Sequence, residues 1–146
     1  MSQYHHIVNV EGIVKKGDYL LTVMRSEAEE HASGTLSFIG GKVEFTDRES
    51  EVVEKTLKRE IMEEVGVEVA NLRFITSTGF TSDNGASVVN LVFLCDWASG
   101  TPRAIDLEEV ASVHWMTVDE IRTHEKTPPW ILEYANIVEA FIIANM

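Results

Sequence analysis

The segment REIMEEVG, residues 59 to 66, decides how the rest of the chain is interpreted. Its apolar residues recur at helical spacing, and Gly66 is a suitable C-terminal cap. A helix is therefore predicted over about residues 46–65. Two starts remain open, because the sequence offers a capping box at Thr46 and Glu49 and a second N-cap at Ser50.

Two glutamates of this helix fall on its inward face. At about 100° per residue, Glu60 and Glu64 lie on the same arc as Leu57 and Ile61, and Glu63 lies at the edge of that arc. A buried carboxylate is costly unless it is paired or binds a metal ion. The alternative is that the helix runs along an edge of the domain and its glutamates reach water. The opposite face, expected in solvent, carries Lys55, Lys58 and Met62.

A divalent cation explains this arrangement better than an exposed edge. Three carboxylates cluster here, the single flanking Arg59 cannot neutralise them, and a glycine pair ends the preceding strand. Mg²⁺ prefers a few carboxylate oxygens together with water and phosphate oxygens. We therefore expect a Mg²⁺ or Mn²⁺ site on this helix.

Composition restricts the class of protein. The chain has 146 residues, 45% of them hydrophobic, which suits one domain over residues 1–146 with a real core. A net charge of −12 argues against a nucleic-acid polymer as partner, because phosphate contacts need Lys and Arg. No apolar run is long enough to cross a membrane. The single Cys95, read as buried filler, fits a reducing, cytoplasmic location.

The predicted elements alternate between strands and helices, which indicates an α/β fold with a mixed sheet and helices on its faces. A hairpin turns at residues 16–18, a short strand leads into the glycine pair, and two long strands flank the turn at residues 81–85. A further strand, a short helix with Thr117 as N-cap and an apolar C-terminal helix follow. His5 and His6 are expected on opposite faces of the first strand. The C-terminal helix is expected to pack on the sheet, with a homodimer as the alternative.

At this point the sequence resembles the Nudix hydrolase family, which includes MutT-like proteins. The family signature is G-x5-E-x7-R-E-U-x-E-E-x-G-U, where U is aliphatic, and residues 59–67 match its second half. Glu51 stands at the position of the earlier glutamate. Gly41 is the expected opening glycine, but it precedes Glu51 by ten residues instead of six, so the loop carries a four-residue insertion.

The resemblance implies an α/β/α sandwich and a set of functional residues. Glu60, Glu63 and Glu64, together with the carbonyl of Gly41, would bind the metal ion, and Arg59 would orient a glutamate by an ion pair. Relatives often hold a phosphate at the position of Arg25. The general base would be Glu60 or Glu63, or one of two glutamates in a later loop, Glu108 and Glu109.

The resemblance also implies an activity. Nudix enzymes hydrolyse a nucleoside diphosphate linked to another group, with Mg²⁺ or Mn²⁺. The residues that follow the motif carry neither the proline of the ADP-ribose type nor the tyrosine of the diadenosine type, and the NADH-type motif SQPWPFPxS is absent. A nucleoside triphosphate, ordinary or modified, is therefore the expected substrate. The alternatives are a catalytically silent Nudix fold that senses a nucleotide, and a purely structural acidic domain.

Overall fold

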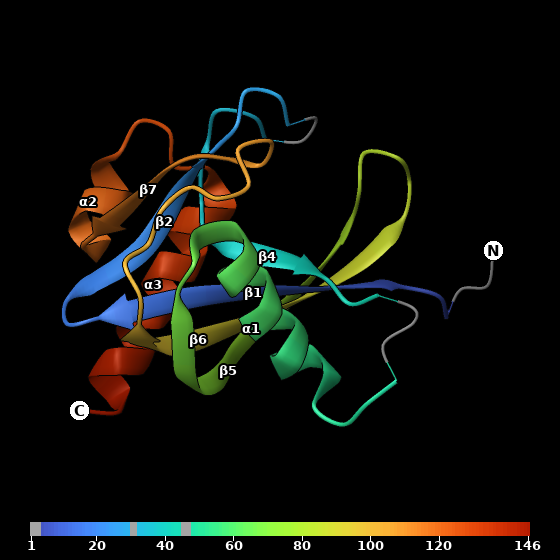
Figure 1. Cartoon of the computed structure of the whole chain (residues 1–146), viewed down its shortest axis with the longest axis horizontal. Coiled ribbons are helices and arrows are strands. Elements are labelled where there is room, and N and C mark those ends of the chain that lie inside the picture. The colour runs from blue at the N-terminus through green and yellow to red at the C-terminus, as the bar shows by residue number, and fades with distance from the viewer. Residues whose placement is uncertain (1–3, 30–31, 45–47) are drawn as a thin grey trace.

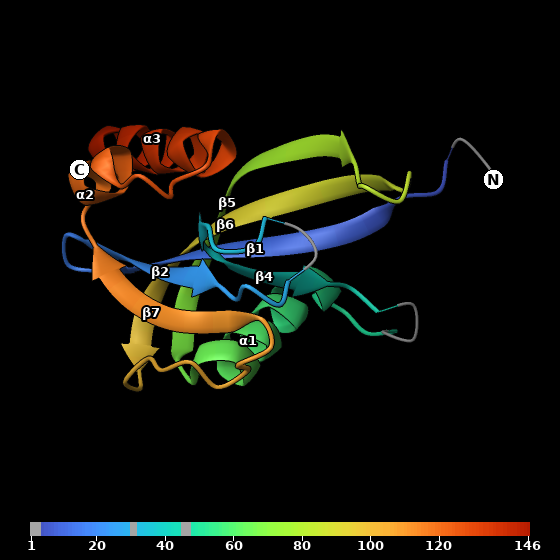
Figure 2. The same ribbon diagram turned by 90° about the horizontal axis from the view of Figure 1, so that it is seen from above.

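A mixed β-sheet forms the middle layer of the molecule, with helices on both of its faces (Figure 1, Figure 2). The computed structural model describes residues 4–29, 32–44 and 48–146. Helix α1 covers one face of the sheet, and α2 and α3 lie on the other (Figure 2). The predicted α/β/α sandwich is confirmed. In order, the elements are β1 (Ile7–Lys16), β2 (Tyr19–Arg25), β3 (Leu36–Ser37), β4 (Ile39–Lys42), α1 (Val52–Val65), β5 (Glu68–Thr81), β6 (Ser87–Ser99), β7 (Val110–Met116), α2 (Val118–Thr123) and α3 (Pro129–Ala144).

The strand order brings the glycine pair of β4 next to a central strand. Across the sheet the order is β3-β2-β1-β6-β5, while β4 pairs with β1 and β7 pairs with β2. Strands β1 and β6 are parallel, and the other pairs are antiparallel. Strand β4 places Gly41 opposite Val10 and Gly40 opposite Glu11. Both glycines therefore lie beside the middle of β1.

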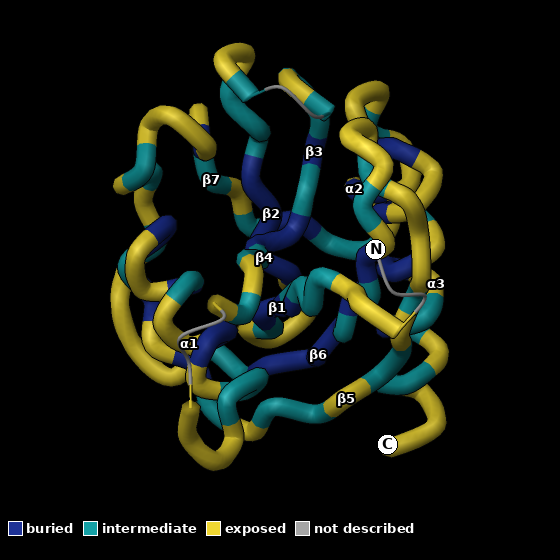
Figure 3. The backbone as a smooth tube through the Cα atoms, turned by 90° about the vertical axis from the view of Figure 1, so that its right-hand side faces the viewer, coloured by how far each residue is buried: buried dark blue, intermediate teal, exposed yellow. Residues whose placement is uncertain are grey.

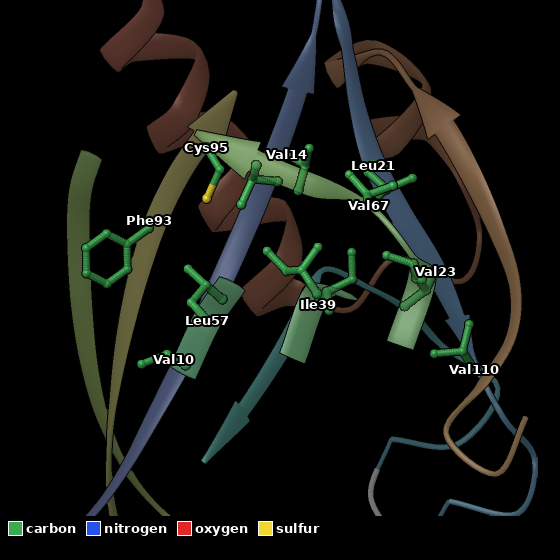
Figure 4. Close-up of a cluster of buried hydrophobic side chains, with 13 residues drawn as sticks. Val10, Val14, Leu21, Val23, Ile39, Leu57, Val67, Phe93, Cys95 and Val110 are labelled. Carbon is green, nitrogen blue, oxygen red and sulfur yellow. The ribbon is translucent and has the colours of Figure 1, made fainter. Parts of the chain in front are cut away.

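Two apolar clusters hold the layers together, one on each face of the sheet. The first packs Leu57, Ile61 and Val65 of α1 against β1 and its neighbours (Figure 4). The second packs α2 and α3 against the other face. Figure 3, in which the backbone is coloured by the burial of each residue, shows that many buried residues lie in the central strands. Each fully buried Leu or Ile contributes about 1.5–3 kcal/mol. A Cβ at Gly12 would lie 3.0 Å from Ile61 Cδ1, so this glycine lets α1 approach β1 closely.

The start of α1 differs from the prediction. The helix begins at Val52, and its N-cap is Glu51, which adopts a left-handed backbone conformation (φ 57°) and makes no side-chain cap bond. Ser50 is therefore not the N-cap, and residues 48–51 are not helical. The Thr46 capping box lies outside the described residues. The C-terminus was predicted correctly, because Gly66 caps the helix at φ 73° and donates its N–H to Met62 O.

Local turn and cap signals were otherwise reliable. The first hairpin turns at Gly17 and Asp18, and the β5–β6 hairpin turns within residues 82–86. Thr117 caps α2 in a complete capping box with Glu120. Cys95 is fully buried. In the described part of the chain, no helix is both long and apolar enough to cross a membrane.

Two further details of the sequence analysis were wrong. His5 and His6 precede β1, which begins at Ile7, and both are exposed, so they do not take opposite faces of a strand. The stretch that leads into the glycine pair forms two short strands, β3 and β4, instead of one. Strand β3 pairs with β2 and β4 pairs with β1, and the chain changes partner strands at Phe38, which lies between them.

Candidate active site

The carboxylate of Glu60 lies directly against the backbone of Gly41. A Cβ at Gly41 would lie 2.3 Å from Glu60 Cδ and 2.8 Å from its Oε1. Only glycine leaves room for this contact. Burial raises the pKa of Glu60, the negative charge of Glu63 raises it further, and the Arg59 guanidinium acts in the opposite direction. The end of β4 and the third turn of α1 thus lie in contact. This agrees with the expectation that the glycine pair and the glutamates of the helix belong to one site.

Glu64 is the most deeply buried carboxylate of α1. Its side chain is 7% exposed, and its Oε2 atom is buried without a hydrogen-bond partner. Burial, and after it a hydrogen bond with Glu109 and the negative charges of nearby acids, together raise its pKa to about 9. A group in this state is costly to ionise unless a cation arrives.

The segment that precedes β7 brings two more carboxylates to Glu64. Its backbone is fastened to the end of α1, because Arg103 N donates to Val65 O and Ile105 N donates to Glu64 O, each at 3.0 Å. As a result, Asp106 and Glu109 both raise the pKa of Glu64, and Glu109 also raises that of Glu60.

Of the two predicted loop glutamates, the structure brings Glu109 to the cluster. Glu108 is exposed, and its backbone N–H donates to Asp106 Oδ1 at 3.2 Å. The sequence analysis missed Asp106. The signal that could have found it is its position three residues before Glu109, in the same turn of the chain.

Glu63 and Arg59 face outward. Their side chains are 61% and 41% exposed, and Arg59 Nε lies 4.0 Å from Glu63 Oε1. The expected ion pair is thus present at a distance where exposed pairs contribute little. Within the described residues, no three acidic, histidine or cysteine side chains converge closely enough to hold a metal ion as they stand. Glu63 would have to turn inward to join Glu60 and Glu64.

The residues nevertheless fit a hard divalent cation. The unpartnered Oε2 of Glu64 supplies a buried oxygen donor, and Glu60 supplies a second one against Gly41. Asp106 and Glu109 add negative charge beside them. Carboxylate oxygens with few nearby cationic groups suit Mg²⁺ or Mn²⁺ and do not suit a soft metal.

Arg25 lies at the end of β2, next to a different carboxylate. It forms an ion pair with Glu29, and the two side chains are 26% and 23% exposed. Its positive charge lowers the pKa of Glu11 on β1. Arg25 is therefore half-buried and is not an ordinary surface arginine.

Among the hollows on the described surface are two of about 430 and 490 Å³, and neither of these is lined by Glu60 or Glu64. One lies on the outer face of α3, and the other lies beside α1 next to Lys58 and Arg59.

A comparison with protein families identifies the fold and the motif together. The profile of the NUDIX domain matches residues 5–140. The chain belongs to the Nudix family. The family resemblance predicted from residues 59–67 is therefore confirmed.

Curated relatives of this Nudix chain carry the name NAD-capped RNA hydrolase NudC. The protein from Mannheimia succiniciproducens is 32% identical over 109 residues, which is 73% of this chain and 38% of the relative. The Vibrio vulnificus protein is 30% identical over 99 residues, or 68% of this chain and 35% of the relative. The match thus spans little more than a third of the length of these relatives.

Solved structures share the fold at lower identity. A Nudix hydrolase from Nitrosomonas europaea superposes with a TM-score of 0.76 at 20% identity, covering 93% of this chain and 90% of that one. The MutT protein from Methanosarcina mazei Go1 gives 0.74 at 19% identity, covering 99% of both chains. The NUDIX domain of Shewanella oneidensis NrtR, solved with ADP-ribose, gives 0.76 at 14% identity and covers 94% and 89%.

Proposed function

We propose that this Nudix chain hydrolyses the pyrophosphate linkage of a nucleoside diphosphate joined to another group, with Mg²⁺ or Mn²⁺. One observation carries the proposal. Glu64 Oε2 is buried without a partner, beside Glu60, which lies against Gly41. A domain that only needed to fold would gain stability by replacing so costly a carboxylate with an apolar side chain.

Each residue of the site would have a separate task. Glu60, Glu64 and the carbonyl oxygen of Gly41 would hold the cation, with Glu63 joining them after a change of rotamer. When bound, the cation would neutralise phosphate charge and polarise the phosphorus–oxygen bond. Arg59 would orient Glu63 through the ion pair that it already approaches.

Glu109 is our choice for the proton acceptor. It is exposed, while its charge acts on both Glu60 and Glu64. An exposed carboxylate next to the cation ligands can accept a proton from the attacking water and then release that proton to solvent. Glu108 is not favoured, because none of the pKa shifts at the site arises from it. Glu60 and Glu63 would then serve as ligands.

A nucleoside triphosphate remains the proposed substrate. The second candidate is a dinucleotide cap on RNA, which the similarity to proteins named NAD-capped RNA hydrolase favours. Two observations argue against the cap. The chain lacks the NADH-type motif SQPWPFPxS, and its charge of −12 opposes a long RNA partner. A silent nucleotide sensor is a weaker proposal, because it gives no reason to retain the inward carboxylates.

The test is a substrate panel with Mg²⁺ and with Mn²⁺, which reads released phosphate and pyrophosphate. The panel contains the common nucleoside triphosphates, ADP-ribose, NADH and an NAD-capped RNA oligonucleotide. Glu64→Gln is expected to fold and to lose hydrolysis at least a hundredfold. The control is Glu54→Gln, on the same helix but outside the cluster. Hydrolysis by Glu64→Gln at the parent rate would refute the proposed site, and binding of nucleotides by the parent without turnover would favour the sensor.

A further inference from the structure

A short turn of the backbone carries Glu109 to the candidate metal site. Residues 107–109 form this turn, and β7 begins directly after it at Val110. The side chain of Glu109 forms a hydrogen bond with Glu64, and its charge also acts on Glu60. The shape of the turn therefore decides where the proposed proton acceptor lies relative to the cation ligands.

Asp106 closes this turn by accepting three successive hydrogen bonds. Its side-chain Oδ1 accepts the N–H of Glu108 at 3.2 Å. Its backbone carbonyl oxygen accepts the N–H of Glu109 at 3.1 Å and that of Val110 at 2.8 Å. An aspartate side chain that binds the N–H two residues later forms an Asx turn, which bends the chain locally. The backbone on both sides of Glu109 is thus hydrogen-bonded to one residue.

Other elements fasten the two ends of the segment. Before the turn, Ile105 N donates to Glu64 O at 3.0 Å, which fixes the chain to the end of α1. After it, Ser26 N donates to Glu109 O at 2.9 Å, which fixes the chain to the residue that follows β2. Val110 is 1% exposed and belongs to the apolar cluster beneath α1. With its ends fixed, the path of the segment depends on the bonds that Asp106 makes between them.

The position of Glu109 matters for the proposed chemistry. A general base must come within about 2.6–3.2 Å of the group whose proton it accepts. A displacement of about 1 Å can lower the rate about a hundredfold. Glu109 is exposed, so its side chain is not fixed by close packing. The backbone turn is therefore the feature that keeps its carboxylate beside Glu64.

We propose that Asp106 is a positioning residue, which holds the turn of residues 107–109 so that the carboxylate of Glu109 stays beside Glu64. This inference rests on the proposed function, in which Glu109 accepts the proton of the attacking water. Asp106 does not contact the substrate in this role. Its side-chain oxygen and its carbonyl oxygen hold the backbone, and Glu109 acts on the water.

Two substitutions at one position test the hydrogen bond. Asp106→Ala removes the acceptor of the Glu108 N–H, whereas Asp106→Asn keeps an acceptor through its amide oxygen. At saturating Mg²⁺, with the best nucleotide of the panel, Asp106→Ala should lower kcat about tenfold or more and leave KM within about twofold, because substrate still binds while the base is displaced. Asp106→Asn should keep kcat within about threefold of the parent. A loss in Asp106→Asn as large as that in Asp106→Ala would overturn the inference.

A double variant tests whether Asp106 acts through Glu109. Glu109→Gln alone should lower kcat about a hundredfold, as expected for loss of a general base. Adding Asp106→Ala to Glu109→Gln should lower kcat by less than about twofold more, because no base is left to position. A further tenfold fall in the double variant would show that Asp106 acts by another route, and Glu109→Gln at the parent rate would overturn the inference as well.

Amide hydrogen exchange, followed by NMR, gives a readout that does not depend on activity. In Asp106→Ala the Glu108 amide should exchange about fivefold faster than in the parent, and Asp106→Asn should restore the parent rate. The amide of Val92, in the core strand β6, should be unaffected in both variants. An unchanged Glu108 rate in Asp106→Ala, or an active Asp106→Ala with the parent kcat, overturns the role of Asp106 alone. A parent that hydrolyses no nucleotide of the panel refutes the proposed function instead.

Discussion

Replacing Glu11 by glutamine should change how the stability of this protein depends on pH. The folded-state pKa of Glu11 is about 7, against 4.5 for a free glutamate. The folded chain therefore holds this proton more tightly than the unfolded chain. Below pH 4.5 the carboxyl is neutral in both states and costs nothing. As pH rises from 4.5 to 7 the folded state loses stability, and above pH 7 the loss is complete.

The size of the effect follows from the pKa shift. At about 1.4 kcal/mol per pKa unit, the full loss amounts to about 3.5 kcal/mol, of which about 2.5 kcal/mol falls between pH 5 and pH 8. Glutamine does not ionise, so the variant escapes this loss. Any constant cost of its NH₂ group cancels when the two pH values are compared. Glu60 and Glu64 titrate in both proteins and cancel in the same way.

The assay is urea unfolding of parent and variant at pH 5 and pH 8, in EDTA, followed by tryptophan fluorescence. The free energy of unfolding of Glu11→Gln relative to the parent should rise by about 2.5 kcal/mol between the two pH values. Glu133→Gln, which removes an exposed carboxylate from α3, should give a difference near zero. A relative free energy of Glu11→Gln that stays constant with pH would refute the reasoning, because the carboxylate would then be as well solvated in the folded chain as in the unfolded one.

Four further outcomes test the other features of the structure. Mg²⁺ should raise the melting temperature of the parent but not that of Glu64→Gln, as thermal denaturation can show. Mg²⁺ affinity measured by calorimetry should rise from pH 6 to pH 9, because the raised pKa of Glu64 makes protons compete with the metal ion, and a constant affinity would exclude Glu64 as a ligand. Gly41→Ala should lower hydrolysis at least tenfold with little loss of stability, since its Cβ displaces the flexible Glu60 carboxylate, whereas Gly79→Ala, whose nearest contact is 3.9 Å, should leave activity unchanged. Leu57→Ala should cost about 2–5 kcal/mol in urea unfolding, and a cost below 1 kcal/mol would contradict its place in the core.

The inward face of α1 could be predicted from sequence because it depends on local geometry. Helical spacing alone placed Glu64 among core residues and Lys58 in solvent, and the structure agrees. The same holds for the Gly66 cap and the Thr117 capping box, where each residue satisfies backbone groups within one turn. The start of α1 was less predictable. Serine is a favourable N-cap residue, but the N-cap position is occupied by Glu51 in a left-handed conformation and not by Ser50.

Only the tertiary structure decided which distant residues share the site. Asp106 and Glu109 reach Glu64 because the loop before β7 is hydrogen-bonded to the end of α1, and no local pattern encodes that contact. Glu11 and Asn90 are 79 residues apart and meet because β1 and β6 pair in parallel. The sequence by itself determined that carboxylates must face inward from α1. The pairing of strands and the docking of one loop decided which other groups surround them, since those contacts arise only when the whole chain is packed.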